Sequence, residues 1–282
     1  MTRLRTDDIN HITGRLSEYD TELELKTGCS LRGLACNAAG IEENDIDNKL
    51  KNVMVGVIPI TSGKGIISGF CEAVKSIVTH IGCNAFIAKT SDVAGLAEAF
   101  ERNADIILLS DDERFVAIHA QSNQVIDNAV ATAKGYVAGL NLMADGLNEK
   151  KVLVIGVGPV GCSATEALSI SGAHVSVYDI NSSRCYEISE SIKQLLKKEI
   201  EIVKELDTAL SSTHLIIDAT PAANIINEHH IGSRSYISAP GIPIGLDVEA
   251  QSKISNRLLH DPLQIGVATM VACACKLHLQ SL

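Results

Sequence analysis

Tryptophan is absent from this 282-residue chain, and aromatic residues make up only 3% of it. The core must therefore be built mainly from Ile, Val, Leu and Ala. No apolar run is long enough to cross a membrane, and residues 1–8 lack the apolar segment of a signal peptide. No basic run occurs and the formal net charge is -10, which disfavours nucleic acid as a partner. We predict a cytoplasmic protein without a membrane or nucleic-acid partner.

Metal-binding spacings are missing as well. The eight cysteines contain no C-x-x-C pair, and no two histidines stand at H-x-x-x-H spacing. His229 and His230 are adjacent, so we expect their side chains to point in different directions. These patterns predict structural thiols in a reducing cytosol and no metal site.

The most informative stretch that is present covers residues 151–161, where an apolar strand pattern leads into G-x-G-x-x-G and then a helical pattern. In this arrangement Gly156 permits a tight turn, Gly158 lets the backbone approach a pyrophosphate, and Gly161 lets the helix pack closely on the strand. Free N–H groups at the helix N-terminus attract the phosphates. The segment predicts a dinucleotide site.

An acid follows the next strand pattern. Residues 174–178 are strand-like and end at Asp179, which can accept hydrogen bonds from ribose hydroxyls. Asp179 would repel a 2′-phosphate, so NAD is favoured over NADP. Arg184 is the nearby cation that could hold such a phosphate.

The chain as a whole predicts an α/β protein with three parts: an N-terminal helical segment (1–40), an α/β substrate domain (41–126), and an interdomain helix with a Rossmann dinucleotide-binding domain (127–282). Strands and helices alternate in both domains, which implies parallel sheets. The default active site is the cleft between them. A small apolar helix closes the chain and could bury against a second subunit, so we predict a homodimer.

The expected elements follow from apolar periodicity. Helices are predicted over 6–26 (with Thr6 as N-cap), 31–39, 66–80, 92–102, 127–144 and 267–279. Strands are predicted over 53–60, 85–88, 105–109, 115–120, 152–155, 175–178, 201–203, 215–218, 236–239 and 258–259.

Polar residues stand where strands of the first domain end. The turn at 61–65 could bind an anion such as a substrate carboxylate through its backbone N–H groups, or be a glycine turn with Ser62 as a helix N-cap. Asp111 and Asp112 end a strand and could hold a substrate ammonium, accept a proton, or cap the next turn. Asn128 could face the cleft or cap the interdomain helix.

Two proline-containing loops follow strands of the second domain. Thr220-Pro221 and the loop at Pro240 lie where open α/β sheets bind ligands, and could stiffen the chain beneath the nicotinamide, or be ordinary turns. The predicted cofactor-binding residues are Gly156, Gly158, Pro159, Val160, Gly161, Asp179, Thr220, Pro221 and Pro240.

Several segments occur together in a specific order. They are Thr-Ser-Gly-x-Gly-Ile-Ile (61–67), Ile-Ile-Leu-x-x-Asp-Asp (106–112), the glycine fingerprint, Ala-Thr-Pro (219–221), Pro-Gly-Ile-Pro (240–243) and Pro-Leu-x-Ile-Gly-x-Ala-Thr-Met (262–270). On these segments the chain, from residue 1 to about 271, resembles the pyrrolysine synthase family. The link at 42–49 and the tail after Met270 are longer than in that family, and Lys64 replaces an uncharged residue.

The resemblance implies an NAD-dependent oxidation of the terminal amine of L-lysine-Nε-3-methyl-D-ornithine, a pseudo-dipeptide. Hydride passes to NAD, ammonia leaves, and the ornithine α-amine closes the pyrroline ring. The resemblance implies catalytic roles for Ser62, Asp111 and Asn128. It implies substrate contacts at Leu4, Thr61, Ser62, Gly63, Gly65, Asp111 and Asn128.

Two other readings stay open at the level of sequence. One is a two-domain dehydrogenase of another small amino or hydroxy acid, related in layout to shikimate dehydrogenases. The other is a non-catalytic NAD-sensing protein, although no basic DNA-binding segment supports a regulator.

Overall fold

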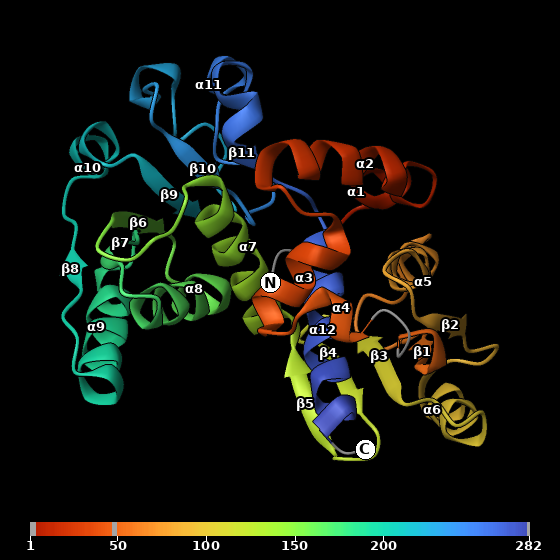
Figure 1. Ribbon diagram of the computed structural model, residues 1–282. Helices are drawn as coiled ribbons and strands as arrows, with labels where there is room; N and C mark the ends of the chain where they lie inside the picture. The colour runs from red at the N-terminus through yellow and green to blue at the C-terminus, as the bar shows by residue number, and fades with distance from the viewer. Residues whose placement is uncertain (1–3, 47–49, 281–282) are drawn as a thin grey trace. The chain divides into compact units, whose positions relative to one another are not determined.

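The computed structural model describes residues 4–46 and 50–280, and the chain divides into two compact units. Unit 1 comprises Met1–Glu24, Cys29–Gly135 and Pro262–Leu282, and unit 2 comprises Leu25–Gly28 and Tyr136–Asp261. Each unit is built around its own sheet (Figure 1).

The N-terminal part is helical as predicted, but its first helix is interrupted. The helices are α1 (Thr6–Ile9), α2 (Ile12–Thr27), α3 (Leu31–Ala39) and α4 (Glu43–Ile46), followed by the 3₁₀ turn η1 (Leu50–Asn52). The N-cap of α1 is Arg5 rather than Thr6. The hydroxyl of Ser30 accepts a hydrogen bond from the N–H of Gly33 and caps α3, which ends at Gly40.

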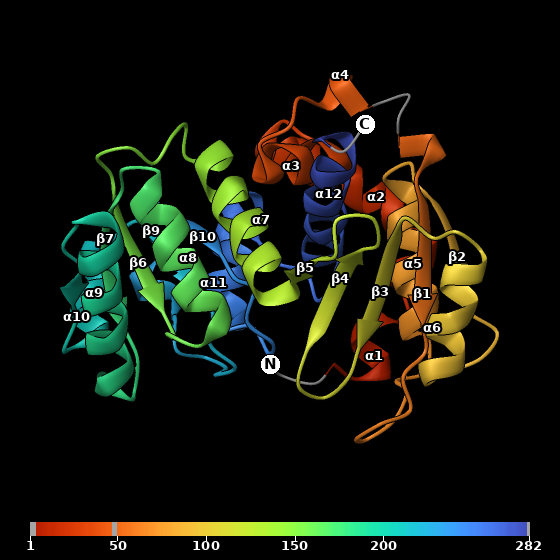
Figure 2. The same cartoon turned by 90° about the horizontal axis from the view of Figure 1, so that it is seen from below.

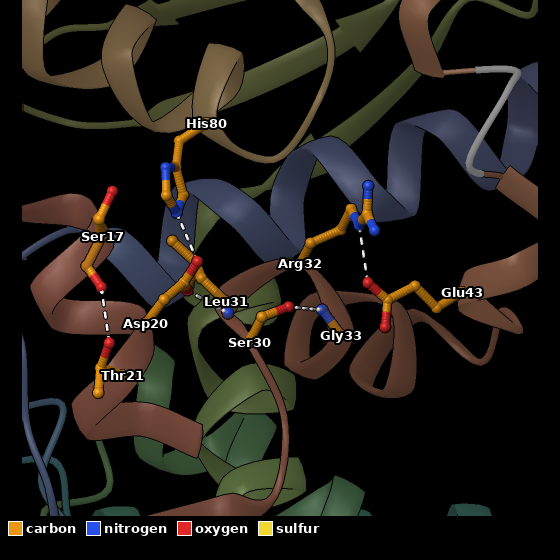
Figure 3. A network of polar contacts seen from close by, with 9 residues as sticks. All are labelled: Ser17, Asp20, Thr21, Ser30, Leu31, Arg32, Gly33, Glu43 and His80. Carbon is orange, nitrogen blue, oxygen red and sulfur yellow. Dashed lines mark hydrogen bonds and ion pairs between the residues drawn. The ribbon is translucent and has the colours of Figure 1, made fainter. Parts of the chain in front are cut away.

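One carboxylate joins three helices of unit 1. Asp20 of α2 accepts the N–H of Leu31 at 2.7 Å through Oδ1, and its Oδ2 lies 2.6 Å from Nε2 of His80, the last residue of α5 (Phe70–His80) (Figure 3). An ion pair between Arg32 and Glu43 then connects α3 to α4 at 2.7 Å. Because the Asp20 bonds join residues far apart in sequence, they fix how α2 and α3 lie against α5.

The sheet of unit 1 has the order β2-β1-β3-β4-β5. Its strands are β1 (Met54–Ile58), β2 (Asn84–Ile87), β3 (Ile106–Ser110), β4 (Phe115–His119) and β5 (Gln124–Asp127). The first three are parallel, as expected, whereas β4 and β5 run antiparallel. The short strand β5 was not predicted. A turn in which Asn123 has a φ of 55° reverses the chain and pairs β5 with β4.

Helices cover both faces of this sheet. Ile58, Phe86 and Ile107 pack against Ala99 of α6 (Asp92–Glu101). Helix α5 covers β1 and β2, and helix α12 (Gln264–Gln280) covers β4 and β5. The two helices also contact each other. Gly56 of β1 leaves the space in which α6 approaches, since a Cβ there would lie 3.2 Å from the Cβ of Ala99. The central strands β1, β3 and β4 are therefore largely buried, whereas the edge strands β2 and β5 are partly exposed.

The end of the chain departs from the predicted domain boundaries. The closing helix α12 was assigned to the second domain, but it belongs to unit 1 and packs along α3. Met270, Val271, Ala274 and Cys275 are buried there. The apolar surface of α12 is thus covered within unit 1, which removes the reason given for placing a second subunit on it. The long helix α7 (Asn128–Met143) is divided between the units after Gly135.

Unit 2 has the predicted Rossmann sheet. Its strands are β6 (Lys151–Ile155), β7 (His174–Tyr178), β8 (Glu201–Ile202), β9 (Leu215–Asp218), β10 (Tyr236–Ser238) and β11 (Leu258–Leu259). All neighbours are parallel, and the order β11-β10-β9-β6-β7-β8 is the doubly wound 3-2-1-4-5-6 arrangement read from the other edge. The order reverses between β6 and β9, which is where such sheets bind ligands.

The helices of unit 2 lie on both faces of that sheet. Helices α8 (Pro159–Ile170) and α9 (Ser182–Leu196) lie side by side on one face (Figure 2). The other face is covered by α10 (Leu206–Ser212), η2 (Glu228–His230), α11 (Val248–Ile254) and η3 (Ser255–Arg257). There Leu153, Ile216 and Ile237 of the strands pack with Leu210 and Ile254.

Candidate active site

The glycine fingerprint forms the tight turn between β6 and α8. Gly156 has a φ of +84°, a conformation that residues with a Cβ rarely adopt, and a Cβ there would lie 2.6 Å from the methyl group of Thr220. Gly158 is the N-cap of α8 and Pro159 is its first residue. Pro159 suits this position because its fixed φ is helical and it has no N–H to satisfy.

The three glycines have three different surroundings. A Cβ on Gly161 would overlap the carbonyl oxygen of Gly156, so α8 packs against the turn as predicted. A Cβ on Gly158, in contrast, would meet nothing within 4 Å. The space beside Gly158 is therefore open at the positive end of a helix, which suits a pyrophosphate group. The observed turn fits a dinucleotide.

Asp179 braces this turn. Its Oδ2 accepts the N–H of Val157 at 2.7 Å, and its Oδ1 accepts the N–H of Asn181 at 2.8 Å. Carboxylate oxygens have further lone pairs, so both can still accept from ribose hydroxyls. The acid therefore has a structural task in the fingerprint, and this task is compatible with the predicted contact to a ribose. Arg184 is exposed on α9.

The predicted proline loops lie beside the fingerprint. Thr220 and Pro221 follow β9, and the backbone of Ala219 approaches Gly156, whose Cβ would lie 3.0 Å from its carbonyl oxygen. Pro240 follows β10, and the N–H of the next residue, Gly241, donates to the carbonyl of Asp218 at 3.1 Å. The structure thus brings the loops after β6, β9 and β10 together at the carboxyl edge of the sheet.

In unit 1 the turn at 61–65 differs from the prediction. It does not lead directly into a helix: α5 starts at Phe70, its N-cap is Gly69, and Ser62 is exposed and caps no helix. Between residues 63 and 69 the backbone forms turns, and Gly63, Gly65 and Gly69 have positive φ. The helix therefore begins several residues later than predicted. The predicted anion site at a helix start is wrong in this respect.

Carboxylates occupy two of the N–H groups that were expected to bind an anion. Asp92 Oδ1 accepts the N–H of Thr61 at 2.8 Å and its Oδ2 accepts the Thr61 hydroxyl, which lowers the pKa of Asp92. Asp112 Oδ2 accepts the N–H of Lys64 at 2.7 Å, and a Cβ on Gly63 would overlap it. A turn filled by two carboxylates favours a cationic ligand over an anionic one.

Asp111 lies at the end of β3 and holds the following turn. Its Oδ1 accepts the N–H groups of Arg114 at 2.7 Å and Glu113 at 2.8 Å. These two bonds lower the pKa of Asp111, so the exposed carboxylate is ionised at neutral pH. Both bonds end on Oδ1, which leaves Oδ2 able to accept from a ligand. Turn capping and ligand binding are therefore compatible at this residue.

The remaining predicted residues lie at the ends of helices. Asn128 is the first residue of α7, but the helix is capped by Asp127, whose Oδ1 accepts the N–H of Ala129 at 2.9 Å. The Oδ1 of Asn128 faces α12, since a Cβ on Gly266 would lie 3.0 Å from it. Leu4 precedes α1 and is partly buried.

The sequence analysis missed three acids, namely Asp92, Asp112 as a loop ligand, and Asp218. Asp92 stands at the first turn of α6, where an acid usually interacts with its own helix, and only the fold shows that it bonds Thr61 instead. Asp218 ends a predicted strand pattern, Leu-Ile-Ile-Asp, and a strand that ends in an acid was the available signal.

One prediction about histidines is also wrong. His229 and His230 do not diverge: their ring centroids are 3.9 Å apart, and within the described residues they form a group of metal-type ligands with Asp207. Nδ1 of His230 accepts the N–H of Asn227, so its Nε2 carries the proton that is donated to Asp207 at 2.8 Å. A protonated nitrogen cannot ligate a metal, and we interpret this group as the cap of η2.

Two further observations concern the cysteines and the length of the helices. All eight cysteines carry free thiols. In the described ranges, 4–46 and 50–280, no helix combines the length and the apolar character needed to span a membrane.

The strand order, the glycine turn and the acid at the end of β7 define a dinucleotide-binding Rossmann domain. Comparison with known families agrees for both parts of the chain. Residues 8–126 match the family described as pyrrolysine biosynthesis protein PylD, N-terminal domain, and residues 126–233 match the alanine dehydrogenase/PNT C-terminal domain.

Two curated relatives cover nearly the whole chain. The pyrrolysine synthase of Methanosarcina barkeri is 30% identical over 273 residues, which are 96% of this chain and 97% of the relative. That of Methanosarcina acetivorans is 30% identical over 276 residues, 96% of this chain and 98% of the relative. The chain belongs to the pyrrolysine synthase family and is an NAD-dependent oxidoreductase.

Solved structures support the fold. Quinate dehydrogenase from Corynebacterium glutamicum, in complex with NAD, has a TM-score of 0.56 at 14% identity, covering 79% of this chain and 92% of its own. Shikimate dehydrogenase from Aquifex aeolicus has a TM-score of 0.54 at 16% identity, covering 80% and 91%. The predicted α/β fold, with an N-terminal helical part and a Rossmann domain, is thereby confirmed.

Proposed function

We propose that this protein oxidises the terminal primary amine of L-lysine-Nε-3-methyl-D-ornithine with NAD. The carbon bearing the amine loses hydride to NAD and the nitrogen loses a proton, which leaves an imine. The ornithine α-amine then attacks the imine carbon, ammonia leaves, and a pyrroline ring remains. The observation that carries the proposal is the 30% identity to two pyrrolysine synthases over 96% of the chain.

The charge of the unit 1 turn supports a substrate that carries amines. Asp92 and Asp112 accept the N–H groups of Thr61 and Lys64, and Asp111, next to Asp112 in sequence, is ionised. An ammonium group has three donors and no acceptor, so it is matched by such carboxylates and by the exposed hydroxyl of Ser62. A substrate carboxylate would be repelled there.

Within this proposal Asp111 is an anchor for the amine rather than its base. Its lowered pKa makes the carboxylate a weak proton acceptor at neutral pH, because an efficient general base has a pKa near the working pH. We assign to Ser62, with Thr61, Gly63 and Gly65 of its turn, the orientation of the same end of the substrate. Leu4 and Asn128 keep the substrate contacts that the family resemblance implies.

The cofactor residues proposed are the fingerprint and its neighbours. Bound NAD accepts the hydride, and the protein supplies its orientation. Gly158 opens the backbone to the pyrophosphate, and Asp179 accepts from the ribose and disfavours a 2′-phosphate. Thr220, Pro221 and Pro240 line the loops at the point where the strand order reverses. These positions follow the general rule for doubly wound sheets.

The proposal is tested with purified protein, NAD and synthetic L-lysine-Nε-3-methyl-D-ornithine. NADH absorbance and product mass are followed together, with lysine and 3-methylornithine as separate control substrates. We expect NADH only with the pseudo-dipeptide, and a product that has lost two hydrogens and ammonia. NAD binding without NADH formation would contradict the proposal and favour an NAD sensor. NADH with another small amino or hydroxy acid would favour a different dehydrogenase.

Two accompanying predictions also stand as proposals. A homodimer is to be tested by sedimentation or light scattering, independently of α12, whose apolar residues are buried in unit 1. A cytoplasmic location is to be tested by fractionation of cells that express the protein.

A further inference from the structure

Asp218 is the last residue of β9 and is completely buried, with 0% of its surface exposed. It stands next to β6 in the sheet, at the edge where the strand order reverses. Burying a carboxylate costs free energy unless hydrogen bonds compensate. None of the steps proposed above uses this residue, so its location needs another explanation.

The carboxylate joins two loops. Its Oδ1 accepts the hydroxyl of Thr220 at 2.8 Å and the N–H of Thr220 at 3.2 Å. Its Oδ2 accepts the N–H of Gly245 at 3.0 Å, and a Cβ on Gly245 would overlap that oxygen. The loop after β9 and the loop after β10 are thus held by the two oxygens of one side chain.

Thr220 carries this contact onward to the fingerprint. Its methyl group would lie 2.6 Å from a Cβ on Gly156. Thr220 therefore packs directly on Gly156, and no residue with a side chain fits at position 156. The N–H of Gly241 also donates to the backbone carbonyl of Asp218 at 3.1 Å. A path of direct contacts therefore leads from Gly245 through Asp218 and Thr220 to Gly156.

We propose that Asp218 is a positioning residue of the cofactor site, whose ionised carboxylate holds the loops after β9 and β10 against the glycine fingerprint and so determines the affinity for NAD. The inference rests on the NAD site described above and adds to it a buried residue that does not touch the cofactor. An ionised carboxylate offers acceptors on both oxygens, whereas a protonated one has an O–H in place of one of them. Protonation therefore weakens one of the two loop attachments.

The protonation falls in an accessible range of pH. Burial raises the pKa of Asp218 from 3.8 to about 6. The hydrogen bonds from Thr220 and Gly245 and the charge of His260 lower the pKa and so offset part of this effect. His260 follows β11, and its Nδ1 donates to the carbonyl of Ala239 at 2.7 Å. His260 is the charged neighbour of Asp218, so it is the residue against which the effect must be controlled.

The experiment is calorimetric titration of NAD into the full-length protein between pH 5 and 8. For the unsubstituted protein we expect NAD affinity to fall about tenfold as the pH is lowered, with a midpoint near pH 6. This is the size expected for loss of one hydrogen bond to a charged group. Asp218→Asn should bind NAD about tenfold more weakly at pH 8 and show no such step. Wild-type affinity, or a retained step, in folded Asp218→Asn would overturn the proposal.

Four further variants make the result specific. Asp207→Asn removes a hydrogen-bonded acid in the first turn of α10, outside both loops, and should leave NAD affinity and its pH step unchanged. His260→Gln should keep the step, and its loss there would assign the titration to His260 and overturn the proposal. Thr220→Val should move the midpoint upward, because the lost hydroxyl bond lowered the pKa of Asp218, whereas Thr220→Ser should not.

Failure of the role proposed for Asp218 can be distinguished from failure of the NAD site itself. If Asp218→Asn does not fold, as judged by circular dichroism and thermal melting, the Thr220 pair decides: equal midpoints in Thr220→Val and Thr220→Ser overturn the role of Asp218. If the unsubstituted protein binds no NAD even at pH 8, it is the cofactor site itself that is contradicted.

Discussion

The carboxyl edges of the two sheets differ in the charge that they can accept. In unit 2 the fingerprint turn leaves open space beside Gly158, at the start of α8. In unit 1, two N–H groups of the turn after β1 donate to Asp92 and Asp112, and the following helix starts only at Phe70. Two α/β sheets with similar glycine-containing turns thus favour opposite ligands, a pyrophosphate in one and an ammonium in the other. The polarity of such an edge depends on which side chains reach the turn.

The largest effect is expected from a methyl group added to the unit 2 turn. Gly161→Ala should destabilise the protein by about 3 kcal/mol or more, because its Cβ overlaps the carbonyl of Gly156 and overpacking is costly. Gly158→Ala should change stability by less than about 0.5 kcal/mol but weaken NAD at least tenfold, since its methyl enters open space. Denaturant unfolding and NAD titration measure the two effects. Equal behaviour of both variants would contradict the assigned roles.

A smaller effect is expected from neutralising the acidic edge of unit 1. Asp111→Asn keeps an oxygen for the N–H groups of Glu113 and Arg114 but removes the charge. We expect KM for the pseudo-dipeptide to rise about tenfold with little change in kcat, the signature of lost uniform binding. Glu113→Gln, the neighbouring exposed acid, is the control and should leave KM unchanged. A fall in kcat at unchanged KM would show instead that Asp111 acts in the transition state.

The response of stability to pH also distinguishes the two edges. Asp218 has a folded pKa of about 6 against 3.8, so the folded state binds the proton more tightly and stability falls as pH rises from about 4 to 6. The unfolding free energy of the wild type, measured relative to that of Asp218→Asn, should therefore fall by up to about 3 kcal/mol as the pH rises over that range.

Asp111 should show the opposite sign. Its pKa is lowered in the folded state, so the stability that it contributes is present above 3.8 and is lost as pH falls below it. Because Asp111 is exposed, solvent screens its bonds and the effect should be small. Urea titrations of both variants from pH 3 to 7 measure the two slopes. Slopes of the same sign would contradict the contrast between the edges.

Most of the fold could be predicted because its signals are local. The buried strands β6, β7 and β9 are apolar runs. The structure confirms the backbone reason for Gly156 and the packing reason for Gly161, whereas Gly158 borders open space. The elements that were missed depend on distant partners. Strand β5 is short and half-exposed and becomes a strand by pairing with β4, and α12 is assigned to unit 1 by its packing along α3.

The sequence by itself determined the Rossmann order of strands and helices, the dinucleotide turn and the family, because these depend on apolar periodicity and on residues close together in the chain. Only the tertiary structure decided which carboxylates enter which turn. Asp92 reaches Thr61 across 31 residues, Asp112 reaches Lys64 across 48, and Asp218 reaches Gly245 across 27. Hydrogen bonds between such distant residues require the sheet to be formed first, so no local pattern predicts them.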